Sequence, residues 1–169
     1  MLAPPGGGKG TQGMRLAREL GVRHISSGDV LRQAVADDTE LGREVKAHMA
    51  AGRLAPDELV TRAVRPVIEK LDGYILDGYP RTLAQADGLE FDAVVYLKVP
   101  DDEVMKRLHA RGREDDKPAV ITERLREYED DTEPLIDHYR DVLVEVDGDR
   151  AADEIAADLK ARLRPQPPT

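Results

Sequence analysis

Hydrophobic positions along the chain fall into two patterns: short consecutive runs, and longer stretches in which apolar residues recur every three or four positions. The run 93–99 (Ala-Val-Val-Tyr-Leu-Lys-Val) is the clearest strand, because it is apolar, rich in β-branched residues and followed by Pro100. The run 74–77 is a second strand, and weaker strands are predicted around 24–25 and over 143–146. The helical spacing predicts helices over 11–20, from about 30, over 40–51, 56–71 and 101–110, from 119, from 132, and over 151–163.

Strands and helices alternate in this pattern, which is typical of a parallel sheet covered by helices on both faces. Pro66 falls inside the predicted helix 56–71 and is expected to kink or split it, because proline removes a backbone hydrogen bond. In parallel sheets of this kind, ligands bind beyond the carboxyl ends of the strands. Residues 6–11, Asp77 and Arg81 all follow predicted strand ends, so we expect them to converge on one site.

The glycine-rich stretch 3–12 (Ala-Pro-Pro-Gly-Gly-Gly-Lys-Gly-Thr-Gln) is the strongest candidate for chemistry. A glycine-rich turn that leads into a helix points successive backbone N–H groups into one concavity, and the helix N-terminus adds a partial positive charge. Lys9 supplies a full positive charge for the β- and γ-phosphates. A side chain at positions 6–8 would stand between backbone and phosphate, so we expect small residues to be required there. The stretch departs from the general pattern G-x-x-x-x-G-K-[ST] at Ala3 and at Gly10.

Composition narrows the class of protein further. The chain has 169 residues, enough for one domain, which we place at 1–163, ahead of a proline-rich tail, 164–169, that is predicted to be disordered. A net charge of −9 argues against nucleic acid or an anionic membrane as the main partner. There is no cysteine and the four histidines are scattered, so no structural zinc is expected. Without a membrane-length apolar run or a signal-peptide pattern, we expect a cytoplasmic protein.

Five motifs, in a fixed order, carry a resemblance to one family. They are 4–12, 24–32, 76–82 with Gln85, 111–113, and Arg124 upstream of 132–135. With them the chain resembles the adenylate kinases of the short-lid type over nearly its whole length, from Leu2 to about Leu163. Gly10, which departs from the general phosphate-loop pattern, is the residue that this family has.

The resemblance implies an α/β fold of the P-loop type, with three layers (α/β/α) around a five-stranded parallel sheet. It also implies a monomer with a helical insertion that binds the nucleoside monophosphate, residues 27–55, and a short lid, residues 111–118. The implied reaction is the reversible transfer of a phosphoryl group from Mg-ATP to AMP, which gives two ADP and serves adenine nucleotide homeostasis. Such a transfer requires positioning and neutralisation of phosphate charge more than covalent help.

The resemblance also assigns roles to individual residues. The implied catalytic set is Lys9, Asp77, Arg81, Arg111, Arg113 and Arg124, in which Asp77 holds Mg²⁺ through water. The implied ATP contacts are Gly6, Gly7, Gly8, Lys9, Gly10, Thr11, Arg111 and Arg150. The implied AMP contacts are Ser27, Arg32, Arg53, Leu54, Ala55, Gly78, Tyr79, Pro80, Arg81, Gln85, Arg113 and Arg124. Within the AMP set, Gln85 is expected to read the adenine base, while the arginines bind phosphate oxygens through their planar forks.

Two features leave alternatives open. Only Met1 and Leu2 precede the loop, whereas the central first strand of the family has several apolar residues. Our hypothesis is that the start is misassigned or that the chain is shortened by about four residues. A kinase for UMP or CMP is the nearest alternative function, because the preference for adenine rests on Ser27 and Gln85 alone. A non-catalytic nucleotide-binding protein is the second, because unpaired backbone beside a central strand is costly.

Overall fold

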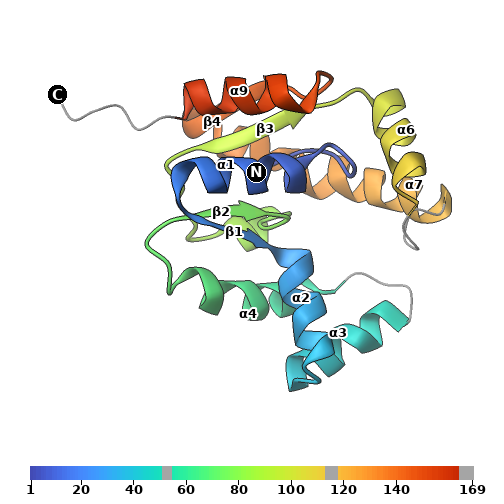
Figure 1. Cartoon of the computed structure of the whole chain (residues 1–169). Coiled ribbons are helices and arrows are strands. Elements are labelled where there is room, and N and C mark those ends of the chain that lie inside the picture. The colour runs from blue at the N-terminus through green and yellow to red at the C-terminus, as the bar shows by residue number, and fades with distance from the viewer. Residues whose placement is uncertain (51–54, 113–117, 164–169) are drawn as a thin grey trace.

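The computed structural model describes residues 1–50, 55–112 and 118–163, and Figure 1 shows their arrangement. The strands are β1 (Arg23–Ser26), β2 (Tyr74–Asp77), β3 (Val94–Lys98) and β4 (Leu143–Asp147). The α-helices are α1 (Lys9–Leu20), α2 (Ser27–Ala36), α3 (Glu40–Ala50), α4 (Asp57–Ile68), α5 (Leu83–Ala86), α6 (Asp101–Arg111), α7 (Pro118–Glu127), α8 (Pro134–His138) and α9 (Ala152–Arg162). A π-helical turn, Tyr128–Thr132, joins α7 to α8, and a 3₁₀ turn, Arg140–Val142, precedes β4.

The strands form two parallel pairs, β1 with β2 and β3 with β4. Met1 and Leu2 lie between the pairs. The amine of Met1 donates a hydrogen bond to the carbonyl of Leu76 in β2 at 2.6 Å. On the other side, the N–H of Leu2 donates to the carbonyl of Val95 at 2.7 Å, and its carbonyl accepts from the N–H of Leu97 at 2.9 Å. The predicted α/β class with parallel strands is therefore confirmed. Where a regular five-stranded sheet was expected, Met1 contacts β2 and Leu2 contacts β3 between two strand pairs.

Helices pack on the strands from opposite sides. Val95 and Leu97 of β3 pack with Ile155 of α9, whereas the neighbouring residue Val94 packs with Leu135 of α8. This alternation follows from the pleat of a strand, which points successive side chains to opposite faces. The pair β1–β2 packs on α4 through a separate cluster of buried residues, Ile25, Val60, Val64, Ile68, Leu76 and Tyr79. Figure 1 accordingly shows α9 beside β3 and β4, and α4 beside β1 and β2.

Most predicted elements are confirmed to within a few residues. The strand 74–77 has the predicted bounds, and the strand predicted at 93–99 spans Val94–Lys98. The helix expected from about residue 30 begins at Ser27, directly after β1, because the Ser26 side chain caps it by accepting a hydrogen bond from the N–H of Asp29. The short helix α5, capped by the side chain of Thr82, was not predicted.

The expectation that Pro66 could split the predicted helix is wrong. The helix α4 continues through Pro66 to Ile68, so the proline does not split it. Pro66 lies near the C-terminal end of α4, where the helix loses a single backbone hydrogen bond. The buried residues Val64 and Ile68 on either side hold this end of the helix against the core.

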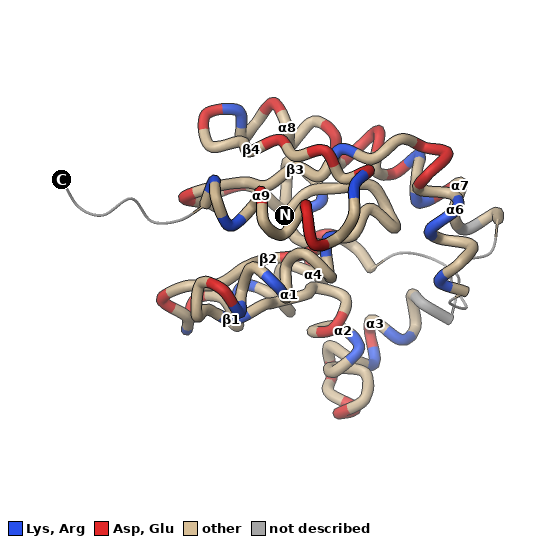
Figure 2. Tube along the Cα trace, turned by 45° about the horizontal axis from the view of Figure 1, so that its top comes forward, with Lys and Arg blue, Asp and Glu red and all other residues tan. Residues whose placement is uncertain are grey.

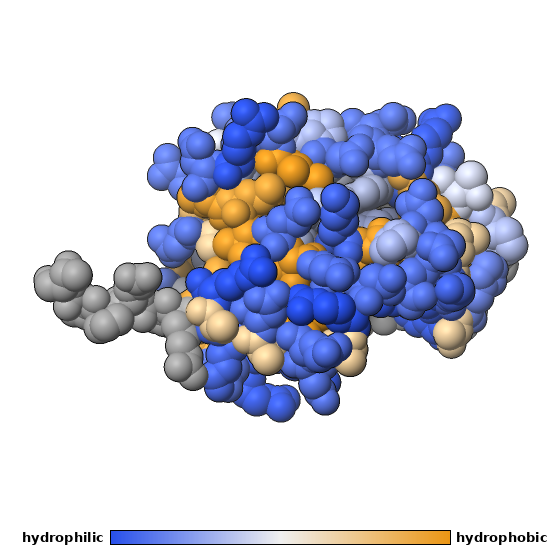
Figure 3. Space-filling model, turned by 90° about the horizontal axis from the view of Figure 1, so that it is seen from above, coloured by the Kyte–Doolittle hydropathy of each residue, from blue (hydrophilic) through white to orange (hydrophobic). Residues whose placement is uncertain are grey.

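The surface is mixed in charge and mostly polar. Figure 2 shows acidic and basic residues interleaved along the described chain, and Figure 3 shows a band of apolar residues bordered by polar ones on the face seen from above. Among the residues whose exposure is described, Met14 and Leu83 are the most exposed large apolar side chains, at 56% and 50%. Within the described residues, no helix is both long enough and apolar enough to cross a membrane.

Candidate active site

The loop ahead of α1 depends on its glycines. Gly6 and Gly8 have φ angles of 73° and 91°, in the left-handed region that side chains other than glycine rarely adopt. A Cβ atom on Gly6 would lie 2.8 Å from the side chain of Leu108, and one on Gly7 would lie 2.8 Å from the Cβ of Ala3. A Cβ on Gly8 would meet no atom within 4 Å. Glycine is therefore required at positions 6 and 7 by packing against neighbouring side chains, and at position 8 by the backbone conformation.

Lys9, the first residue of α1, folds back over this loop. Its ammonium group donates hydrogen bonds to the carbonyls of Ala3 at 2.8 Å and Pro4 at 3.3 Å. Burial lowers the pKa of the Lys9 side chain from 10.5 to about 8, and nearby Asp77 opposes that shift. Arg81, Arg124 and Arg111 lower the pKa of Lys9 further, because each is a like charge. Lys9 and these three arginines therefore lie near enough to influence one another, and their combined positive charge favours binding of an anion.

Asp77 ends β2 beside the same loop and is only 8% exposed. Its Oδ2 lies 3.5 Å from Nε2 of His24 and 3.6 Å from the position that a Cβ on Gly10 would occupy. Nε2 of His24 is buried, and it has no hydrogen-bond partner within the described residues. The absence of a side chain at Gly10 therefore leaves room directly beside a buried carboxylate.

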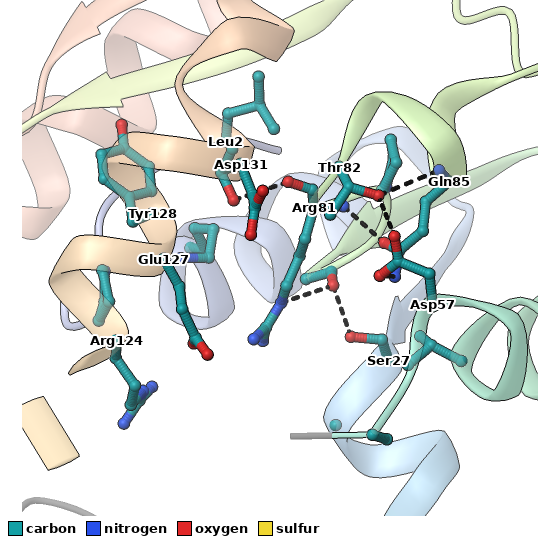
Figure 4. Close-up of a pocket in the computed structure, with 18 of the residues that line it drawn as sticks. Leu2, Ser27, Asp57, Arg81, Thr82, Gln85, Arg124, Glu127, Tyr128 and Asp131 are labelled. Atoms are coloured by element: carbon teal, nitrogen blue, oxygen red, sulfur yellow. Dashed lines mark hydrogen bonds between the residues drawn. The ribbon is translucent and has the colours of Figure 1, made fainter. Parts of the chain in front are cut away.

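A cavity of about 380 Å³ opens next to the loop, and Figure 4 shows many of the residues that line it. Arg124 and Glu127 lie on the left of the view, Asp57 and Gln85 lie on the right, and Arg81 lies between them. Apolar side chains complete the lining, among them Leu31, Ala55 and Val60. The cavity therefore combines a charged side, an apolar surface and an amide group.

Gly78 is the centre of a hydrogen-bond cluster in this cavity. Its carbonyl accepts from the Ser27 hydroxyl at 2.8 Å and from Nε of Arg81 at 3.0 Å. Gly78 has a φ of 78°, and a Cβ there would lie 2.6 Å from the Ser27 hydroxyl oxygen. The backbone carbonyl of Arg81 in turn accepts from the hydroxyl of Thr132 at 2.8 Å. Hydrogen bonds to the carbonyls of Gly78 and Arg81 thus join residues from separate motifs of the sequence.

Gln85 is buried, 3% exposed, and both ends of its amide are engaged. Its Oε1 accepts from the backbone N–H of Arg81 at 2.7 Å, and its Nε2 donates to Oδ1 of Asp57 at 2.9 Å. The second carboxylate oxygen of Asp57 accepts from the hydroxyl of Thr82 at 2.6 Å. Hydrogen bonds therefore connect three lining residues, Gln85, Asp57 and Thr82, on the side of the cavity away from Arg124 (Figure 4).

Glu127 adds a negative charge to the cationic side of the cavity. Burial raises the pKa of the Glu127 carboxyl above its ordinary value, the nearby Glu123 raises it further, and Arg81 and Arg124 oppose the shift. Figure 4 shows the Glu127 carboxylate pointing toward the space between these two arginines. The cations that face the cavity are thus partly balanced by a carboxylate of the protein itself.

Several residues of the predicted site lie away from the cavity. Arg32 is ion-paired with Asp29 at 2.5 Å, and the Tyr79 side chain is buried, with its hydroxyl 3.1 Å from that of Thr61. The Arg150 guanidinium pairs with Asp158 of α9 at 2.7 Å, and Thr11 on α1 is exposed. The predicted residues Arg53, Leu54 and Arg113, with most of the predicted lid, lie outside the described residues.

Three residues at the site were not predicted from the sequence. From the sequence, Asp57 was placed at the start of a predicted helix, His24 was treated as one of four scattered histidines, and Glu127 was given no role. A carboxylate at the start of a helix is a common capping feature, so the sequence gives no signal that Asp57 contacts Gln85. Their roles depend on contacts between distant segments of the chain.

A glycine-rich loop that leads into a helix, a buried carboxylate at a neighbouring strand end and a cluster of cations together define a phosphate-binding P-loop protein. A sequence model of the adenylate kinase family matches residues 1–144. The adenylate kinase of Nocardia farcinica is 46% identical over 167 residues, covering 92% of this chain and 92% of the relative. The adenylate kinase of Mycolicibacterium smegmatis is 44% identical over 169 residues, covering 93% of each, and adenylate kinase 1 of a Nostoc species is 44% identical over 176 residues, covering 96% of each.

The chain therefore belongs to the adenylate kinase family. The family predicted from the motifs is confirmed, and with it the class of enzyme, a kinase that acts on adenine nucleotides.

Proposed function

We propose that this chain transfers the terminal phosphoryl group of Mg-ATP to AMP, and that the cavity beside Gln85 is the AMP site. One observation carries the proposal: a single cavity of about 380 Å³ joins Lys9, Arg81 and Arg124 to an apolar surface and a buried amide. A nucleoside monophosphate has the matching chemistry, an anionic phosphate joined to a flat base with polar edges. The phosphate of AMP is itself an anionic nucleophile, so the transfer needs positive charge and positioning from the protein.

The residue roles follow from this placement. The loop 6–11 and Lys9 bind the ATP phosphates, and Arg111 acts on the same side. Arg81 and Arg124 hold the phosphates between the two nucleotides, while Ser27, Gly78 and Gln85 contact AMP. We keep the remaining assignments as proposals of the same kind: Thr11 and Arg150 for ATP, and Arg32, Arg53, Leu54, Ala55, Tyr79, Pro80 and Arg113 for AMP.

Asp77 fits a magnesium ion held through water. The ion prefers oxygen ligands and keeps several waters of its own, and the carboxylate is buried beside a position, Gly10, that has no side chain to fill the space. Magnesium bound there would neutralise charge on the ATP phosphates. The chain's own contribution is to hold the hydrated ion with Asp77 and the phosphates with Lys9.

We also propose the finer fold of the family for this chain. Leu2 takes the place of a central strand between the two strand pairs, so that β1–β2 and β3–β4 act as one sheet, and this is supported by its hydrogen bonds to β3 and by the Met1 amine on β2. Residues 27–55 form the AMP-binding segment, residues 111–118 the lid over ATP, and the enzyme acts as a cytoplasmic monomer within the domain 1–163.

The test is ADP formation with Mg-ATP and AMP, UMP, CMP or GMP offered in parallel. We expect turnover with AMP and its loss in Lys9→Met. Arg124→Ala should lower kcat/KM for AMP about 100-fold. Arg126→Ala is the matched control, because Arg126 lies on the same helix but is 70% exposed and paired with Glu123, and it should change kcat/KM less than about twofold. Preference for UMP or CMP, or equal effects of the two arginine variants, would refute the proposal.

A further inference from the structure

We propose that Asp57 is a positioning residue that fixes the orientation of the Gln85 amide and thereby selects adenine over purines that carry an oxygen at position 6. The inference rests on the proposed function, in which Gln85 contacts the base of AMP. Asp57 is the first residue of α4 and lines the cavity together with Gln85.

The hydrogen bonds permit only one orientation of the amide. A carboxylate only accepts hydrogen bonds, and a backbone N–H only donates them. Because Gln85 lies between Asp57 and the N–H of Arg81, its NH₂ must face the carboxylate and its oxygen must face the N–H. A rotation of the amide by 180° would place oxygen against carboxylate and NH₂ against N–H, and both contacts would become repulsive.

The position of Asp57 is itself well defined. Its other oxygen accepts from the Thr82 hydroxyl at 2.6 Å, and Thr82 caps the short helix that carries Gln85. The first turn of α4 also favours a negative charge, because helix N–H groups point toward it. The carboxylate is therefore held from two sides against the helix that presents the amide.

The fixed orientation of the Gln85 amide leaves a defined pair of hydrogen-bonding groups, one donor and one acceptor, for a ligand. An amide has two N–H donors and two acceptor lone pairs, and within the described residues Gln85 uses one of each. One donor and one acceptor thus remain, on an amide that lines the cavity beside the apolar residues Leu31, Ala55 and Val60.

Adenine complements this pattern, since it presents a ring-nitrogen acceptor next to its amine donor. Hypoxanthine presents the reverse, an N1–H donor next to an O6 acceptor. A glutamine that is free to turn serves both bases equally, whereas a glutamine held by a carboxylate serves adenine alone. The Asp57–Gln85 contact is therefore a device for base selection rather than only for packing.

The experiment compares AMP with IMP, which differ only at position 6 and the adjacent ring nitrogen. ADP formation from Mg-ATP is measured with each acceptor for the wild type and for Asp57→Asn, and the ratio of their kcat/KM values is taken. An asparagine can donate as well as accept, so it tolerates the turned amide. We expect the ratio of AMP to IMP to fall about tenfold in Asp57→Asn, with a lower kcat/KM for AMP and an equal or higher one for IMP.

Two control variants separate base selection from a loss of structure. Glu58→Gln changes the neighbouring carboxylate of α4, which is exposed and does not line the cavity, and should leave the ratio unchanged. Thr82→Val removes the second partner of Asp57 and a helix cap, so it should lower the melting temperature but change the ratio less than about threefold. A parallel loss of activity with AMP and IMP in Asp57→Asn, at a constant ratio, would overturn the proposal.

The failure of the proposed function has a different signature. If Gln85→Ala leaves the KM for AMP unchanged, then Gln85 does not contact the base and the site assignment is wrong. If Gln85→Ala raises that KM while Asp57→Asn leaves the ratio intact, only the role of Asp57 is wrong. Should Asp57→Asn not fold, the side-chain N–H protons of Gln85 in the wild type decide: we expect AMP to shift mainly one of the two in the NMR spectrum, and equal shifts would contradict a fixed amide.

Discussion

Lys9 gives the sharpest quantitative prediction, because the pKa of its side chain lies within the pH range of ordinary assays. Burial and three nearby arginines lower the pKa of Lys9 from 10.5 to about 8 in the free chain. In the proposed site the ATP phosphates bind beside Lys9 and supply negative charge, so their binding must raise the pKa of Lys9 again. ATP binding near pH 8 should therefore be accompanied by uptake of a proton from the buffer.

The magnitude follows from the protonated fraction. With a pKa of about 8, Lys9 is about 90% protonated at pH 7, about half protonated at pH 8 and about 10% protonated at pH 9. Binding at pH 8 should then take up about half a proton, and the apparent affinity for ATP should fall about tenfold between pH 7 and pH 9. The terminal phosphate of ATP loses its last proton near pH 6, so it contributes little in this range.

Calorimetric titration of the chain with ATP in buffers of different ionisation enthalpy measures this uptake directly. Lys9→Arg is the matched control, since an arginine does not deprotonate in this range, and its binding enthalpy should not depend on the buffer at pH 8. The Met1 amine, whose pKa burial lowers to about 6, is mostly neutral at pH 8 in both proteins. A buffer-independent enthalpy for the wild type, or the same proton uptake in Lys9→Arg, would refute the reasoning.

The stability of the ligand-free protein should show the opposite trend with pH. The unfolded chain binds its Lys9 proton up to pH 10.5, whereas the folded chain releases it near pH 8. The unfolded state thus holds more protons between these two values, so the contribution of Lys9 to the free energy of unfolding should rise from pH 8 to pH 10.5. ATP affinity should fall over the first part of this range.

Two further predictions concern the cavity and the core. Glu127→Gln removes the carboxylate beside the cavity arginines and should lower the KM for AMP about threefold, whereas Glu129→Gln, at an exposed position two residues on, should not change it in the same assay. Leu135→Ala, at a fully buried position, should lower the free energy of unfolding by about 3 kcal/mol and the melting temperature by roughly 6–12 °C. Leu83→Ala, at a side chain that is 50% exposed, is its control in thermal and urea denaturation, and similar losses in both variants would contradict the packing described here.

The sequence predicted the elements whose signals are local. The strands at 74–77 and 94–98 are consecutive apolar runs next to turn residues, and their bounds are close to those in the structure. The loop before Lys9 was recognised by its glycines, although the reason for glycine differed: Gly6 and Gly7 are required by Leu108 and Ala3, which no local pattern reveals.

The features that sequence reasoning missed depend on long-range contacts. The helix α4 continues through Pro66 because its buried face packs on the pair β1–β2. The contact of Asp57 with Gln85 joins positions 28 residues apart in the chain. From the sequence alone, an acidic residue at a helix start is interpreted as a helix cap. No local pattern indicates that Asp57 contacts the amide of Gln85.

The helical stretch from α7 through the π-helical turn to α8 has a mechanical consequence. It joins Arg124, which faces the cavity, to Leu135, which is fully buried between α8 and β3. Because Leu135 is held in the core, we expect this stretch to move about Leu135 as its fixed point, with Arg124 about 16 Å away at the rise of an α-helix. A rotation of about 5° around this fixed point moves the guanidinium by roughly 1.4 Å, which is enough to make or break a hydrogen bond to phosphate. A substitution that repacks the surroundings of Leu135 should therefore shift Arg124, an arginine of the cavity lining, from a distant position on the same helical stretch.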